Sequence, residues 1–266
     1  MRKTFLFPNL LFALILFSSC EQPLEEKDFP YELKLVIRGI LKPDKLIDSV
    51  YIGRTLPIGV PFDEDFANLN DAVGAVISDG VFYPLRYTAN GIYTTDSLIA
   101  RRGEKYYLLV QWQDKSASAE TYIPQAGKLL NSGIVKVNEI DTSYSVIECT
   151  IDPVESEAYA VTWVLKYFGG QVIDESESFA EVVRSTSNEI IKVRSDPIPD
   201  DVLTSINTLG VGIYIYDRVF YDFYLSQEVN KTPTGIFGYP ATNAKWNIKG
   251  DGIGLFIGRV DMIVNL

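Results

Sequence analysis

Alternation of apolar and polar residues, interrupted by glycine turns, is the feature that most restricts the fold of this chain. Residues 31–38 alternate with period two, which places their apolar side chains on one face of an extended strand. An Asp-Gly pair at 79–80 and an Asn-Gly pair at 90–91 separate later apolar segments, and such pairs favour tight hairpin turns. Because similar turn signals recur about every 8–12 residues, residues 31–125 are predicted to form an antiparallel β-sandwich of the immunoglobulin or transthyretin kind.

The second half of the chain is also rich in strand patterns, with one exception. Between residues 217 and 226 the apolar side chains recur at helical spacing, behind an aspartate, Asp217, that can cap a helix. We therefore expect a mainly β protein, with a second β-rich module over residues 131–266 that packs one short helix on its sheet. The aromatic residues of that helix are expected in a core rather than in a ligand platform. A single continuous domain is the alternative to two modules joined near residues 124–130.

The first nineteen residues have the organisation of a secretory signal. A basic start, Met1-Arg2-Lys3, precedes an apolar run that ends at Phe17, and two small serines follow it. The run is too short to span a bilayer, which needs about 20 apolar residues. Cleavage is predicted between Ser19 and Cys20, which removes residues 1–19.

Cys20 gives this signal a more specific meaning. Phe17-Ser-Ser-Cys20 resembles the bacterial lipobox, in which the cysteine is acylated and becomes the first residue of the mature chain, although Phe17 stands where leucine is usual. Acyl chains contribute about 0.8 kcal/mol for each buried CH₂, so two or three chains hold a protein firmly on a membrane. Cleavage without lipidation is the alternative.

Residues 20–30 follow with four acids and two prolines and without apolar periodicity. This composition predicts a solvated, extended tether. Acids directly after the lipidated cysteine also resemble the signal that exports lipoproteins of Bacteroidetes to the outer cell surface. The expected location is therefore the outer membrane, with a lipid anchor and exposure at the cell surface.

Composition excludes several classes of function. The 266-residue chain contains no histidine, which removes Ser-His-Asp and Cys-His catalysis and histidine metal sites. Its net charge of −11 argues against nucleic acid as a partner, because phosphate binding needs clustered basic residues. Cys149, left without an intramolecular partner once Cys20 is lipidated, lies in an apolar strand pattern and is expected to be a buried structural thiol.

Two segments are candidates for contact surfaces rather than for chemistry. The acids Asp63, Glu64 and Asp65 occupy a proline-rich loop, and the glycines Gly250, Gly252 and Gly254 lie near the end of the chain. The glycine run lacks the following helix of a dinucleotide site, so a turn or bulge between edge strands is predicted there. The acid clusters lack the spacing of a calcium loop and are interpreted as solvated loops. No catalytic residue, metal or cofactor is predicted.

The order of several motifs is similar to that of the DUF4249 family of Bacteroidetes lipoproteins. The segments Lys34–Gly39, Val50–Pro57, Asp71–Asp79 and Thr121–Pro124 resemble its N-terminal half, and Asn247–Phe256 resembles its closing pattern, with Asp251 in place of a glycine. The resemblance implies a surface lipoprotein of no assigned activity, of a kind often encoded beside TonB-dependent outer-membrane receptors. It carries over no catalytic residue.

Three hypotheses of function follow. The leading one is a non-enzymatic accessory lipoprotein that captures or presents a ligand for a TonB-dependent transporter. The second is a surface glycan hydrolase with an unrecognised carboxylate pair, which requires two acids about 5–10 Å apart in one cleft. The third is a structural or adhesive surface module without a small ligand.

Overall fold

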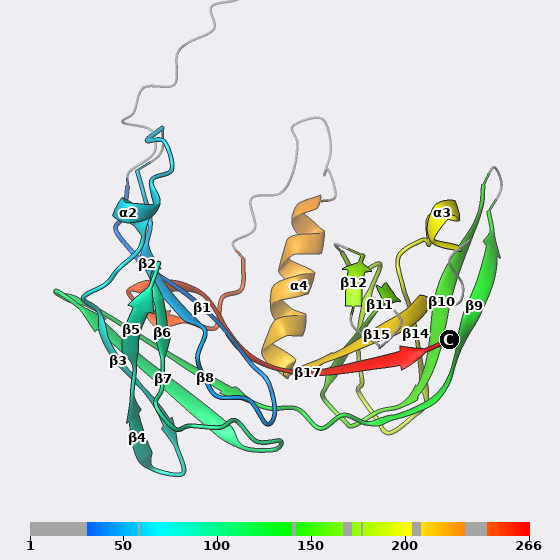
Figure 1. Ribbon diagram of the computed structural model, residues 1–266, viewed down its shortest axis with the longest axis horizontal. Helices are drawn as coiled ribbons and strands as arrows, with labels where there is room; N and C mark the ends of the chain where they lie inside the picture. Colours follow the sequence, from blue (N-terminus) through cyan, green and yellow to red (C-terminus); the bar gives the residue numbers. More distant parts are fainter. Residues whose placement is uncertain are drawn as a thin grey trace, which may run out of the picture.

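The computed structural model describes residues 31–57, 59–139, 142–166, 172–176, 178–203, 209–231 and 244–266. Ser19, Cys20 and the predicted tether lie outside these residues. The described chain is mainly β, as predicted, and forms a nine-stranded, a five-stranded and a three-stranded sheet. Two β modules lie side by side, and helix α4 (Arg218–Lys231) stands between them (Figure 1).

The first module is the predicted sandwich. One of its sheets is part of the nine-stranded sheet, and the other is the five-stranded sheet, in the order β16-β8-β7-β3-β4. Residues such as Leu35, Ile52 and Leu108 are fully buried between the two sheets. The strands of this module are β1 (Leu35–Leu41), β2 (Val50–Arg54), β3 (Val73–Ser78), β4 (Val81–Pro84), β5 (Arg86–Ala89), β6 (Ile92–Thr94), β7 (Lys105–Trp112), β8 (Lys115–Tyr122) and β16 (Lys249–Gly250).

Both predicted glycine turns are confirmed. Asp79 and Gly80 have φ of 50° and 75°, and they join β3 to β4. Asn90 and Gly91 have φ of 50° and 74°, and they join β5 to β6. Two successive residues with positive φ are typical of the hairpin turn whose twist matches that of its strands.

The second module is built in three layers. The three-stranded sheet, in the order β14-β10-β9, covers one face of the strands β11 and β15, and α4 covers their other face. The elements of this module are β9 (Lys128–Asn138), β10 (Ser143–Asp152), β11 (Ala158–Lys166), β12 (Val172–Glu175), β13 (Val182–Arg184), β14 (Ile191–Arg194), the four-residue helix α3 (Asp200–Leu203), β15 (Leu209–Tyr216) and α4.

The predicted aromatic helix is confirmed as α4. Asp217 accepts a hydrogen bond from the backbone N–H of Phe220, at 3.2 Å, and so caps the first turn. The ring of Phe220 stacks on that of Tyr216 with centroids 3.8 Å apart. Tyr221 and Tyr224 join the same apolar cluster, so these aromatic side chains belong to a core, as expected.

One long strand, β17 (Gly252–Asn265), runs through both modules (Figure 1). Residues 252–258 pair with β1 in parallel, and residues 259–265 pair with β15 in antiparallel orientation. The β1–β17 pair joins two segments at opposite ends of the described chain, because the chain returns to the first module only after it has built most of the second. Residues 249–258 therefore pair with first-module strands, although the sequence analysis placed them within the second module.

Candidate functional site

The predicted acidic loop contains a single helical turn, α2 (Glu64–Ala67). Asp63 caps this turn, because its Oδ1 accepts hydrogen bonds from the backbone N–H groups of Asp65, at 3.0 Å, and Phe66, at 3.4 Å. Glu64 and Asp65 lie in the first turn, where negative charge is favourable. The acids thus shape the loop, and among the described residues no three His, Cys, Asp or Glu side chains are grouped as metal ligands.

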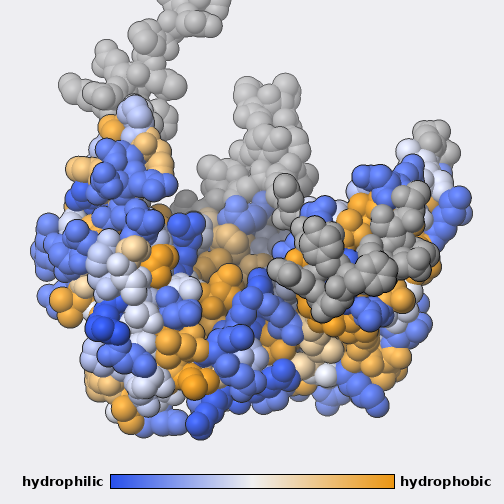
Figure 2. Space-filling view, viewed as in Figure 1, coloured by the Kyte–Doolittle hydropathy of each residue, from blue (hydrophilic) through white to orange (hydrophobic). Residues whose placement is uncertain are grey.

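The apolar side chains of this loop are exposed as well as its acids. Val60, Phe62 and Phe66 have 50%, 73% and 48% of their surface exposed. Arg54 holds Phe66 in place: its Nε donates to the carbonyl oxygen of Phe66 at 2.6 Å, and its guanidinium lies 3.7 Å from the centre of the ring. Hydrophobic side chains are visible around α2 in the space-filling view (Figure 2). We call residues 59–67 the apolar loop; the sequence analysis weighed its acids and missed its phenylalanines.

The apolar loop lies beside the point where the described chain begins. The hydroxyl of Tyr31 donates to the carbonyl oxygen of Thr55 at 2.7 Å, and the hydroxyl of Thr55 donates to that of Glu32 at 3.0 Å. Thr55 follows Arg54, which binds Phe66. Residues 31–32 and the apolar loop are therefore fastened to the same end of β2.

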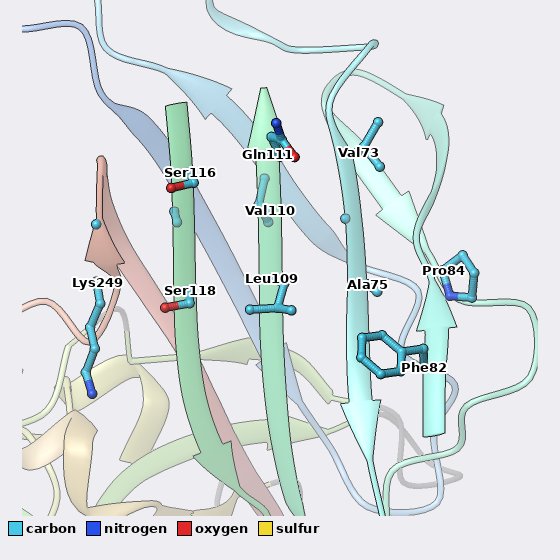
Figure 3. Close-up of a pocket in the computed structure, with 13 residues that line it drawn as sticks. Val73, Ala75, Phe82, Pro84, Leu109, Val110, Gln111, Ser116, Ser118 and Lys249 are labelled. Carbon is cyan, nitrogen blue, oxygen red and sulfur yellow. The ribbon is translucent and has the colours of Figure 1, made fainter. Parts of the chain in front are cut away.

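A groove of about 650 Å³ lies on the outer face of the five-stranded sheet (Figure 3). Exposed apolar side chains from three neighbouring strands, Val73, Phe82 and Leu109, line it. Lys249 and Gly250 form its rim on the edge strand β16. We call this feature the sheet groove. Its lining is apolar with few polar groups, which is the usual character of a binding pocket.

The three predicted contact glycines have different surroundings. Gly250 has φ of +86° and lines the sheet groove, in a turn that Asp251 fastens to Ser116 through hydrogen bonds of 2.8 and 3.0 Å. This confirms the predicted turn. Gly252 and Gly254 lie in β17, which is an interior strand rather than the edge strand expected there. A Cβ on Gly254 would meet the carbonyl oxygen of Ile37 at 1.9 Å, so the absence of a side chain there serves close strand packing.

Two carboxyl groups are buried where the modules meet. Asp217 accepts hydrogen bonds from the hydroxyl of Thr121, at 2.5 Å, and from the backbone N–H of Gly258, at 3.4 Å. Glu157 accepts one from the hydroxyl of Tyr122 at 2.8 Å. Burial raises the pKa of Asp217 to about 6 and that of Glu157 to about 7.

These buried acids join the modules. The bonds of Asp217 connect the end of β8, the middle of β17 and the first turn of α4. Neither acid lines the sheet groove, and the exposed fractions of Asp217 and Glu157 are 0% and 4%. The pair therefore has a structural role at the junction in this conformation of the chain.

Cys149 is buried, as predicted. It is fully inaccessible within the core of the second module. Burial raises the pKa of its thiol to about 12, and the neighbouring Glu148 adds to this effect. The thiolate that a nucleophilic cysteine needs is thus strongly disfavoured.

A comparison with protein-family models finds a match for the chain. The family model described as a domain of unknown function, DUF4249, matches residues 21–260. The chain belongs to the DUF4249 family. The match covers β1 to β16, helix α4 and the part of β17 that pairs with β1, so strands of both modules belong to the DUF4249 match.

Further comparisons add no activity to this DUF4249 protein. A search of curated protein sequences finds no match. No helix among the described residues is both long and apolar enough to cross a membrane.

Proposed function

We propose that this DUF4249 protein is a non-enzymatic lipoprotein, anchored through Cys20 in the outer membrane and exposed at the cell surface. There it serves a TonB-dependent transporter as an accessory protein that captures or presents a ligand. The observation that carries the proposal is the position of the apolar loop, which exposes Phe62 and Phe66 and is fastened through Phe66 to the end of β2 that also binds Tyr31.

The length of the tether keeps this loop near the membrane. Residues 20–30 comprise eleven residues, which extend to about 40 Å at most. A lipid on Cys20 therefore holds Tyr31, and the apolar loop beside it, within reach of a membrane-embedded partner. Exposed apolar patches rimmed by polar residues are typical of protein interaction sites. The acids Asp63, Glu64 and Asp65 disfavour an anionic lipid surface as the partner, which favours a protein.

The first experiment concerns the anchor. Replacement of the lipidated residue, Cys20→Ala, is expected to block processing or to release the protein from membranes. Cell fractionation with metabolic labelling by a fatty acid measures both effects. Recovery of the variant as a mature, membrane-bound protein would show that the anchor lies elsewhere and would remove the basis of the proposal.

The second experiment concerns the partner. A tagged chain purified from solubilised outer membrane is expected to bring a TonB-dependent receptor with it, identified by mass spectrometry. Phe62→Glu should abolish this recovery, whereas Phe82→Glu, which changes another exposed phenylalanine in the sheet groove, should preserve it. Recovery of the chain without a receptor, or an equal loss with both variants, would contradict the proposed use of the apolar loop.

A further inference from the structure

A second pocket, of about 630 Å³, lies on the face of the nine-stranded sheet that also carries α4. Its floor is formed by outward-facing side chains of β1, β2, β6 and β17, and the segment that follows β1 closes one side. Leu255, the strand partner of Arg38, packs against the α4 cluster, which places the pocket and the helix on the same face. The volume lies in the range of about 300–1,000 Å³ that small-molecule sites occupy.

The charge of this pocket is opposite to that of the chain. Four cationic side chains and one acid, Asp48, line it, in a protein whose net charge is −11. The cations are Arg38, Lys42, Lys45 and Arg259. A concave site lined by one sign of charge concentrates ligands of the other sign.

The four cations divide into two pairs. Asp261 forms ion pairs with both members of the rear pair, at 2.7 Å from Lys42 and 2.6 Å from Arg259. The front pair, Arg38 and Lys45, takes part in none of the ion pairs among the described residues. The front pair therefore offers hydrogen-bond donors that no carboxylate of the described chain occupies.

Arg38 is held in position by an aromatic ring. Its guanidinium lies 4.5 Å from the centre of the Tyr51 ring. Tyr51 in turn lies across two glycines, since a Cβ on Gly53 would meet its hydroxyl at 2.3 Å and a Cβ on Gly91 its ring at 2.8 Å. A guanidinium stacked on a ring keeps its N–H edge available for two parallel hydrogen bonds to an oxyanion.

Apolar surface adjoins the front pair. Ile40 and Leu46 line the same pocket and have 48% and 36% of their surface exposed. An inorganic ion would leave this surface uncovered, whereas a ligand with a hydrocarbon part would bury it.

We propose that this pocket binds a small organic anion, with its carboxylate or phosphate group between Arg38 and Lys45 and its apolar part on Ile40 and Leu46. If this anion is the ligand that the protein captures for the transporter, that part of the inference rests on the proposed function. Binding itself requires no receptor.

Calorimetry on the lipid-anchored protein in nanodiscs, with empty nanodiscs subtracted, tests the proposal with hexanoate, hexyl phosphate and hexylammonium. At least one of the two anions should bind, and hexylammonium should not. The tighter of the two anions identifies the oxyanion group. Arg38→Gln and Lys45→Gln should each weaken binding about tenfold, as expected for loss of a charge-assisted hydrogen bond.

Two further variants complete the design. Arg86→Gln is the matched control, because Arg86 is an exposed cation paired with Asp96 outside the pocket, and it should bind as the unmodified protein does. Ile40→Ser should weaken binding of each hexyl anion that binds the unmodified protein. Equal binding of hexylammonium and the anions, absence of binding by both anions, or unchanged affinity in both Arg38→Gln and Lys45→Gln would overturn the inference. Recovery of the receptor with the tagged chain would be unaffected by that result, so the two proposals fail separately.

Discussion

Two eight-residue strands, β7 in the first module and β15 in the second, differ in how many of their faces are covered. In β7 every second residue is buried and the residues between are exposed, whereas all residues of β15 are buried. The outward-facing side chains of β7 border the sheet groove, and those of β15 lie under α4. The outer sheet face of the first module is thus exposed and available for contact, whereas the corresponding face of the second module is buried under α4.

Because of this difference, side chains that stabilise the fold and side chains that are available for recognition lie in different modules. Side chains under α4 contribute to folding, and their loss should be costly. Side chains at the same positions of β7 contribute little to folding and can serve a partner. The junction between the modules, where β17 passes from one sheet to the other, depends on close backbone contact and should be the most sensitive region of all.

The largest effect is expected at the junction. A Cβ on Gly258 would lie 2.0 Å from the carbonyl oxygen of Tyr122, so Gly258→Ala must displace β8 from β17. We expect a loss of more than about 3 kcal/mol in the free energy of unfolding, measured by denaturant titration. Gly133→Ala is the control, because a Cβ on Gly133 meets no atom within 4 Å. Equal stability of the two variants would show that the modules are not tightly joined there.

An effect of similar size is expected under α4. Tyr216→Ala removes a buried ring that stacks on Phe220, and it should cost about 3–5 kcal/mol. Tyr107→Ala on the open face of β7 removes a ring with 42% of its surface exposed and should cost less than about 1 kcal/mol. Thermal unfolding of both variants measures the difference. Similar costs would mean that the two strands are covered alike.

The pH dependence of stability tests whether the carboxyl group of Glu157 is buried at the junction. Because the pKa of Glu157 is raised to about 7 in the folded chain, its contribution to stability is complete at low pH and is lost as the pH rises through that value. Glu157→Gln should flatten the decline in stability between pH 5 and pH 8 by about 1 kcal/mol or more. Part of the decline in stability should remain in Glu157→Gln, because the pKa of Asp217 is also raised in the folded chain.

The control for this prediction is Glu155→Gln, which changes an exposed glutamate two residues earlier. It should leave the pH profile unaltered. A Glu157→Gln profile that is as steep as that of the unmodified protein would indicate that the carboxyl group of Glu157 reaches solvent.

The smallest effect is expected on the open face of the first module. Leu109→Thr retains a residue suited to strands at an exposed position and should change the free energy of unfolding by less than about 0.5 kcal/mol. Val211→Thr on β15 places a hydroxyl in the core and should cost about 1–3 kcal/mol. Chemical denaturation compares the two, and a costly Leu109→Thr would mean that this face is covered in the native protein.

Much of the fold could be predicted from the sequence because its signals are local. The strand patterns, the turns at 79–80 and 90–91, and helix α4 behind Asp217 each depend on residues close together in the chain. The short edge strands β12, β13 and β14 were not predicted, because three or four residues carry too little periodicity to be recognised.

The candidate site was less predictable. Its acids and glycines were predicted from their residue types, whereas its exposed apolar surface comes from Val60, Phe62 and Phe66, which lie on either side of those acids. Exposure of an apolar side chain depends on what the rest of the chain places over it. A phenylalanine in a loop has the same local pattern whether a neighbouring segment covers it or not.

The sequence by itself determined that the chain forms mostly strands, where they turn and where one helix begins, since backbone propensity and side-chain periodicity act over a few residues. Only the tertiary structure decided that β17 pairs with β1 and with β15, and that Arg38 and Lys45 line one pocket. It also decided that α4 covers the second sheet face of the second module, whereas the outer sheet face of the first module stays exposed. Those features join segments up to about two hundred residues apart in the chain, and their arrangement follows from packing of the whole core rather than from any local pattern.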